Sequence, residues 1–226
     1  MTPISWPCPL PGGGVAREYA LAFDRDRTVR LLIVPALFDE FNRLRRLTVE
    51  VMRRLDGAGI DSILPDLPGC NESLQPLESQ SVEDWCDAMS AAAIQFGATH
   101  ALGIRGGAMF TPAHLSCWHY APVKGASILR QMLRARILAS REAGRDENRD
   151  RLMAQAMREG IELAGYRLGA ELVRGLEPFA PQSGDRVTEI GQDMVGGSGL
   201  WLRAEPGESD EQADALAAIL ALGMAA

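Results

Sequence analysis

The order of hydrophobic and polar positions predicts alternating strands and helices in the first half of the chain. A largely apolar run at 29–34 is typical of a strand buried on both faces. At 39–59, apolar residues recur at helical spacing, arginines occupy the opposite face and glycines end the helix. Ser81 and Asp84 form a capping-box pattern that opens a second helix. Shorter apolar segments predict further strands at 60–69, 100–104 and 116–123.

Three strand–helix alternations with short connections favour an α/β fold, with a mostly parallel sheet flanked by helices on both faces. A Pro/Gly-rich arm and a predicted edge strand at 18–24 precede these alternations. The pattern at 124–180 is helical only, which predicts a cap inserted over the carboxyl edge of the sheet. We expect the sheet to resume at 185–191 and 199–205, and a last helix to follow. The chain is therefore predicted to be one domain, 1–226, with a helical cap insertion.

Composition excludes several classes of protein. The chain has 226 residues, 46% of them hydrophobic and 23% charged, and a net charge of -7, which disfavours nucleic acid as a partner. No apolar run approaches the roughly 20 residues of a membrane-spanning helix. The N-terminal segment has neither the basic start nor the apolar core of a secretion signal, so we expect a cytoplasmic protein. The histidines are scattered, and we expect neither a metal nor a cofactor. No metal-ligand spacing links the cysteines, which we expect to be reduced: Cys8, Cys70, Cys86 and Cys117.

The segment Thr99–Phe110, THALGIRGGAMF, has the pattern of a strand, a sharp turn and a helix start. Small residues at Gly103, Gly107 and Ala108 match the nucleophile elbow of α/β-hydrolases, in which a strained turn exposes the nucleophile at the sheet edge. The position of the nucleophile carries Arg105. A guanidinium group has five donors and no acceptor, so it can hold an anion but cannot attack a substrate. A plain glycine-rich turn stays open as the alternative.

The histidines do not supply the base of a Ser-His-Asp triad. An α/β-hydrolase takes that base from a loop after the last strand, whereas His100, His114 and His119 are the only histidines of this chain. His100 begins the elbow strand, roughly 16 Å from the active edge, and His119 lies within a strand, so both fit structural roles. His114 stays a weak candidate. Cys70 lies in a turn at the carboxyl edge, where Arg105 could lower the pKa of its thiol, although an unreactive cysteine is the simpler interpretation.

The loop after the first long strand, PALFDEFNRLRR, concentrates polar residues where an α/β-hydrolase has its oxyanion loop. Acidic residues in a first helical turn can act only as caps, and later arginines can form a solvated face. That interpretation suits Arg43, Arg53 and Arg54. It suits Glu40 and Asn42 less well, and we expect these two, with Arg45 and Arg46, to belong to the site.

Six segments resemble, in order, the motifs of the exosortase A system-associated hydrolases of the second type. They are VPALFDEFNRLRRL, DLPGCNES, LGIRGGA, APVKGASILRQMLRARIL, LAGYRLGAEL and GSGLWLRAE. In that family arginine also takes the position of the nucleophile. The similarity covers about 30–205 and implies an α/β-hydrolase fold tied to exopolysaccharide production. This chain departs from the pattern at Ala36 and Leu37, and with Ser-Gly-Leu before Trp201.

The leading hypothesis is an α/β-hydrolase-fold protein that acts on or binds a small anionic or acylated metabolite. If it is an enzyme, Arg105 would stabilise negative charge at the pocket floor, Glu40 would be a general acid or base, and Asn42 would orient it. We expect Arg105 to be partly buried and within salt-bridge reach of Glu40 or Glu205 when no ligand is bound. Trp201 would wall the pocket. The remaining predicted substrate-binding residues are Phe38, Arg45, Arg46, Cys70 and Gly106. The competing hypotheses are a catalytically inactive binding or assembly protein on the same fold and an enzyme that uses the Cys70 thiol.

Overall fold

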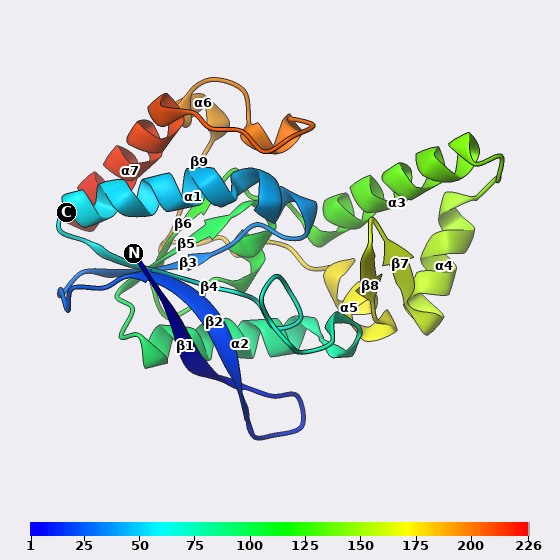
Figure 1. The fold of residues 1–226 in the computed structure, drawn as a ribbon, viewed down its shortest axis with the longest axis horizontal. Helices are drawn as coiled ribbons and strands as arrows, with labels where there is room; N and C mark the ends of the chain where they lie inside the picture. The colour runs from blue at the N-terminus through cyan, green and yellow to red at the C-terminus, as the bar shows by residue number, and fades with distance from the viewer. Residues whose placement is uncertain (226) are drawn as a thin grey trace.

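The computed structural model describes residues 1–225 and contains a seven-stranded sheet with helices on both faces (Figure 1). The strand order is β1-β2-β4-β3-β5-β6-β9, and every pair from β4 to β9 is parallel. The strands are β1 (Thr2–Pro9), β2 (Val15–Phe23), β3 (Arg30–Val34), β4 (Asp61–Pro65), β5 (His100–Ile104), β6 (Ser116–Tyr120) and β9 (Val187–Ile190). The predicted α/β fold with a mostly parallel sheet is confirmed.

Helices α1 (Asp39–Gly57) and α7 (Asp210–Ala225) cover one face of the sheet, and α2 (Val82–Gln95) covers the other (Figure 1). The apolar positions predicted for α1 are buried between it and the sheet. At the start of α2 the predicted capping box is present. The Asp84 amide donates to the Ser81 hydroxyl at 3.1 Å, and the Ser81 amide donates to the Asp84 carboxylate at 2.8 Å.

The N-terminal arm is a strand, which corrects two expectations. Strand β1 pairs with β2 in an antiparallel hairpin, so β1 and not the segment 18–24 forms the edge of the sheet. Alternate residues Trp6 and Cys8 are buried against the core. The prolines at 3, 7 and 9 are compatible with β1 because an edge strand can leave backbone positions without a ladder hydrogen bond.

The segment 124–180, in which a cap was predicted and which is called the cap below, extends sideways from the sheet (Figure 1). It consists of α3 (Gly125–Glu142), α4 (Arg149–Glu159), the strands β7 (Ile161–Leu163) and β8 (Tyr166–Leu168), and α5 (Ala170–Leu176). The expectation of helices only was therefore wrong. A two-residue turn, Ala164 and Gly165, closes the hairpin, and both of its residues have positive φ.

The second C-terminal strand was also wrongly predicted. The segment at 199–205 forms a single 3₁₀ turn, η3 (Leu200–Leu202), and β9 is the last strand of the sheet. The short helix α6 (Gln192–Val195) lies between β9 and η3. Two further 3₁₀ turns are η1 (Leu77–Ser79) and η2 (Arg105–Phe110). None of the helices among residues 1–225 combines the length and apolarity needed to span a bilayer.

Candidate functional site

The turn after β5 has the geometry of a nucleophile elbow. Arg105 has a φ of 54°, a value that non-glycine residues rarely adopt. A Cβ atom on Gly107 would lie 2.3 Å from the Pro35 carbonyl oxygen, and one on Gly103 would lie 2.4 Å from the Cα of Ala108. The turn therefore requires glycine at both positions, and it holds Arg105 rigidly at the carboxyl edge. The elbow is followed by the short turn η2 instead of a long helix.

Strained backbone positions gather around this edge. Non-glycine residues with positive φ follow four adjacent strands: Asn71 after β4, Phe38 after β3, Arg105 after β5 and Ala121 after β6. Phe38 also has a ψ of -131°, far from the left-handed helical region. Each such residue costs on the order of 1–3 kcal/mol, and such residues cluster where a protein binds or reacts. The carboxyl edge is therefore the best candidate site of this fold.

Arg105 is held on three sides. Its Nε donates to one Glu40 carboxylate oxygen at 3.0 Å, and its Nη2 donates to the other at 3.1 Å. Its Nη1 donates to the Ala121 carbonyl at 2.7 Å. The indole ring of Trp201 covers the guanidinium face, with Cζ 4.1 Å from the ring centroid. The Arg105 and Glu40 side chains are only 13% and 9% exposed, so they form a nearly buried ion pair with two-point geometry.

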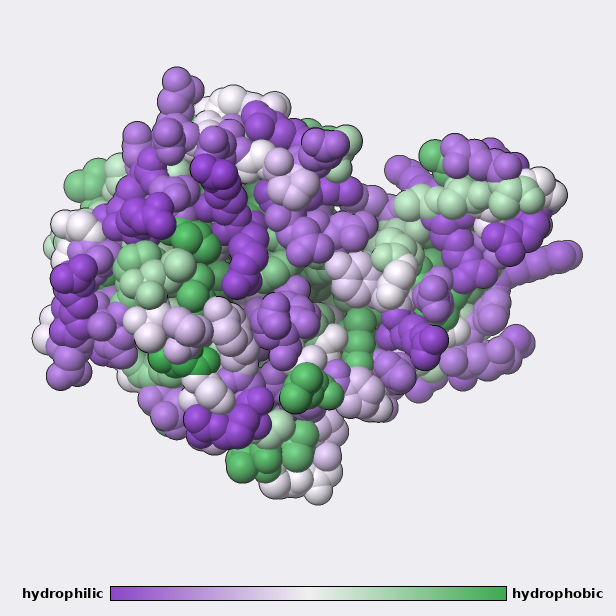
Figure 2. Space-filling model, in the orientation of Figure 1, coloured by the Kyte–Doolittle hydropathy of each residue, from purple (hydrophilic) through white to green (hydrophobic). Residues whose placement is uncertain are grey.

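A small cavity lies next to this ion pair, between the start of α1, helix α3 and the β7–β8 turn. Its free volume is about 90 Å³. Its lining residues are Leu37, Phe38, Asp39, Glu40, Arg43, Ile128, Gln131, Met132, Ala135 and Ala164. Figure 2 shows the molecule notched between the body and the cap. The lining includes Glu40 but not Arg105, so the expectation that Arg105 forms the pocket floor was wrong: it lies behind the carboxylate.

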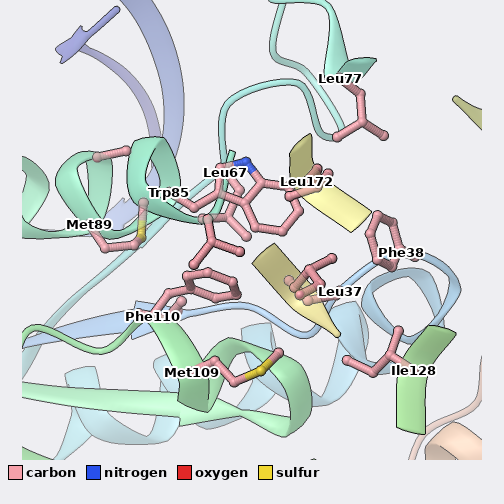
Figure 3. Packing of buried hydrophobic residues seen from close by; sticks show 14 of the residues in the cluster. Leu37, Phe38, Leu67, Leu77, Trp85, Met89, Met109, Phe110, Ile128 and Leu172 are labelled. Carbon is pink, nitrogen blue, oxygen red and sulfur yellow. The ribbon is translucent and has the colours of Figure 1, made fainter. Parts of the chain in front are cut away.

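The apolar wall of the cavity belongs to the main core of the protein. Figure 3 shows Phe38 and Ile128 at one side of a continuous apolar cluster that also contains Leu37, Trp85 and Phe110. The wall is therefore packed and preformed. A larger open groove, of about 570 Å³, lies between α2 and α5 and includes none of the predicted site residues.

The comparisons with known proteins agree with this architecture. The structure is similar to that of a candidate hydrolase from Agrobacterium vitis S4, with a TM-score of 0.53, 14% identity, and coverage of 76% of this chain and 70% of that one. It is also similar to the α/β-hydrolase GrgF from Penicillium sp. sh18, with a TM-score of 0.50, 14% identity, and coverage of 80% and 74%. The fold is that of an α/β-hydrolase. No family model and no curated protein matches the sequence.

None of the three histidines forms a hydrogen bond with the Arg105 side chain, whose partners are Glu40 and Ala121. His119 is fully buried, its Nε2 is 2.9 Å from the Thr111 hydroxyl, and burial lowers its pKa. Its strand neighbours Trp118 and Tyr120 face α1 and α7, so His119 points to the opposite face of the sheet. His100 begins β5, and exposed His114 precedes β6, so both lie at the amino edge. In an α/β-hydrolase, the segment after the last strand carries the base histidine next to the elbow. In this protein the segment after β9 places Trp201 against Arg105 instead.

Several predicted site residues lie outside the cavity. Asn42 is exposed and lies two residues beyond Glu40 on α1, so it faces another direction. Arg46 is paired with Glu208 on the surface. Arg45 lies over the ring of Phe41, with Cζ 5.0 Å from its centroid. Glu205, the second expected partner of Arg105, is exposed and forms no ion pair within residues 1–225.

Other predicted residues lie at the cavity or close to it. Phe38 lines the cavity and packs edge-on against Tyr166 of the cap, with ring centroids 5.1 Å apart. Gly106 packs so tightly against Leu37 that a Cβ atom there would lie 2.8 Å from the Leu37 side chain. Cys70 lies in an adjacent hollow beside Phe38 and Tyr166. Burial raises the pKa of the Cys70 thiol to about 12, so the thiolate required of a nucleophile is disfavoured.

Sequence reasoning missed Asp39 and Arg43 as site residues. Arg43 was assigned to a solvated face, yet it lines the cavity and its Nη1 donates to the Trp201 carbonyl at 3.0 Å. The sequence feature that could have identified them is their spacing. Asp39 and Arg43 lie one helical turn apart and therefore share a face of α1. Within the described residues, no group of three or more His, Cys, Asp or Glu side chains is placed to hold a metal.

Proposed function

We propose that the protein binds a small metabolite that carries a carboxylate or acyl group, in the cavity between α1 and α3, without hydrolysing it by nucleophilic catalysis. The observation that carries the proposal is the two-point ion pair of Arg105 with Glu40 at the elbow. Of the alternatives drawn from the sequence, this pair favours the binding protein over the hydrolase.

The chemistry of the pair supports binding rather than turnover. Arg105 takes the position of the nucleophile and can neither attack nor accept a proton. Each oxygen of Glu40 already accepts a hydrogen bond from the guanidinium, which stabilises the ionised carboxylate and weakens it as a base. Trp201 covers one face of the guanidinium, and it comes from the segment after the last strand, where an α/β-hydrolase carries its base histidine. The elbow therefore acts as a rigid support for Glu40 at the cavity wall.

The cavity supports a small ligand with an apolar part. Its volume of about 90 Å³ corresponds to roughly three water molecules. Leu37, Ile128 and Met132 provide an apolar wall that a short acyl chain can contact, and Arg43 provides the positive charge for a carboxylate. The motif resemblance extends the proposal to a cytoplasmic role in exopolysaccharide production.

Binding is tested by filling the cavity mouth. Ala135 is an exposed residue of α3 that lines the cavity, and Ala139 lies one turn further on the same helix, outside it. We expect Ala135→Phe to abolish the thermal stabilisation that propionate and short acyl thioesters give the wild type, and Ala139→Phe to preserve it. If the ligands stabilised the two variants equally against thermal unfolding, the binding site would lie outside this cavity.

Turnover is tested with p-nitrophenyl esters and acyl thioesters. We expect no rate above the uncatalysed reaction for the wild type, for Glu40→Gln or for Arg105→Ser, because no histidine lies at the elbow to accept the proton of a serine. Wild-type turnover that is lost in Glu40→Gln would refute the binding role and assign general acid–base catalysis to Glu40.

A further inference from the structure

Asp39 and Arg43 are a potential ion pair that the structure keeps apart. They are four residues apart on α1 with the acid first, the arrangement in which side chains on a helix usually attract each other. Within residues 1–225, neither forms an ion pair. The only hydrogen bond of the Arg43 side chain there goes to a neutral acceptor, the Trp201 carbonyl. Both residues line the same cavity.

The remaining charged side chain that lines the cavity, Glu40, is already neutralised. Glu40 lies between the two residues in sequence, and its carboxylate is neutralised by Arg105 at 3.0 and 3.1 Å. The cavity therefore presents one free negative charge, Asp39, and one free positive charge, Arg43, beside an apolar wall. A ligand with a single carboxylate would satisfy Arg43 and leave Asp39 facing a like charge.

We propose that the ligand is a small zwitterion, an α-amino acid, whose carboxylate binds Arg43 and whose ammonium group binds Asp39. Side chains four residues apart on a helix have Cβ atoms about 5–6 Å apart, a gap that groups flanking one carbon atom can bridge. The volume of about 90 Å³ admits only a short side chain, which would contact Leu37, Ile128 and Met132. This inference rests on the proposed function, because it assumes that the cavity binds a small carboxylate.

The test compares ligands that differ in one group. Calorimetric titration with alanine, lactate and propionate compares three acids that carry an ammonium group, a hydroxyl group or a hydrogen at the same carbon. A second series, glycine, serine and 2-aminobutyrate, keeps the ammonium group and varies the side chain. We expect at least one of the amino acids to bind about tenfold or more tightly than the matched hydroxy or unsubstituted acid, since a charge-assisted hydrogen bond is gained. Asp39→Asn should remove this preference, and it should retain or strengthen propionate binding, because the like charge that faces the carboxylate is removed.

Arginine variants complete the test. Arg43→Gln should lose binding of all these carboxylates, and Arg43→Lys should recover part of it. Arg53→Gln, an exposed charge change on the same helix, should change nothing. Thermal unfolding of each variant verifies that α1 is folded.

The two proposals fail in different ways. If propionate binds as tightly as every amino acid and Asp39→Asn has no effect, the zwitterion is excluded and the carboxylate-binding cavity stands. If none of the carboxylates and no acyl thioester binds, and Ala135→Phe behaves as Ala139→Phe does, the cavity is not a ligand site and both proposals are overturned.

Discussion

The indole ring of Trp201 lies over the guanidinium of Arg105, with 4.1 Å between Cζ and the ring centroid. Trp201 comes from η3, after the last strand, and Arg105 from the elbow after β5. The same ring packs edge-on against Tyr120 at the end of β6, with ring centroids 5.9 Å apart. This contact therefore fastens the C-terminal segment to the centre of the sheet edge, and it is electrostatic as well as apolar.

Replacing Trp201 with Ala should destabilise the protein. The variant loses the cation–π contact and part of a half-buried ring, which together cost about 2 kcal/mol of unfolding free energy. Leu202→Ala is the control, since Leu202 is its neighbour in η3 and is 75% exposed. Its effect should stay within about 0.5 kcal/mol. Urea unfolding measures both, and equal losses would show that the Trp201 contact adds nothing.

The pair of Arg105 and Glu40 should behave as one unit. Arg105→Met or Glu40→Leu alone leaves a nearly buried charge without its partner, which costs about 3–5 kcal/mol. The double variant removes both charges and should be less destabilised than the sum of the single variants. A double-mutant cycle by urea unfolding measures this coupling. If the losses of unfolding free energy in the two single variants simply added up in the double variant, the ion pair would make no contribution of its own to the stability of the elbow.

Most of the fold could be predicted because its strands and helices carry strong local signals. The buried strands β3, β4 and β5 are largely apolar runs, and the apolar stripe of α1 has helical spacing. Strand β1 was missed because its three prolines disfavour a strand in general, and only its place at the edge makes them acceptable. The β7–β8 hairpin was missed because three-residue strands show too little alternation.

The site was only partly predictable, because spacing fixes the direction of a side chain and not its partner. Arg105 and Glu40 were foreseen together, since the loops that carry them follow neighbouring strands β5 and β3. Glu205 was misplaced because its segment was expected to be a strand that ends at the sheet edge. Arg43 was overlooked because the cap residues that line the same cavity are distant from it in sequence.

The thiol of Cys70 should be unreactive in the folded protein. Burial raises its pKa to about 12, so at pH 8 nearly all of the thiol is protonated. We expect iodoacetamide to modify Cys70 at least about a hundredfold more slowly in the native protein than in urea, where the pKa returns to about 8.5. Peptide mapping by mass spectrometry follows the reaction. Rapid labelling of native Cys70 that propionate slows would instead support the thiol-enzyme hypothesis.

Asp66, at the end of β4, should make stability depend on pH. It is fully buried, and burial raises the pKa of its carboxyl to about 6, although the Asn71 side chain and the Glu72 amide each donate to it at 3.2 Å. The folded protein therefore favours the protonated form, whereas the unfolded chain ionises with an ordinary pKa of about 3.9. The contribution of Asp66 to stability is greatest below about pH 4 and is lost as the pH rises through about 6.

Asp66→Asn should remove this component of the pH dependence. The wild type should lose up to about 3 kcal/mol of unfolding free energy from Asp66 between about pH 4 and pH 7, relative to the variant. The variant loses one of the two hydrogen bonds, because the asparagine side chain has a single acceptor oxygen and its NH₂ group cannot accept from the second donor. The loss of this hydrogen bond is nearly independent of pH. The change with pH in the difference between the two unfolding free energies therefore reports the titration of Asp66 alone. Urea unfolding at several pH values between about 4 and 8 measures it, and a constant difference across that range would show that folding does not raise the pKa of Asp66.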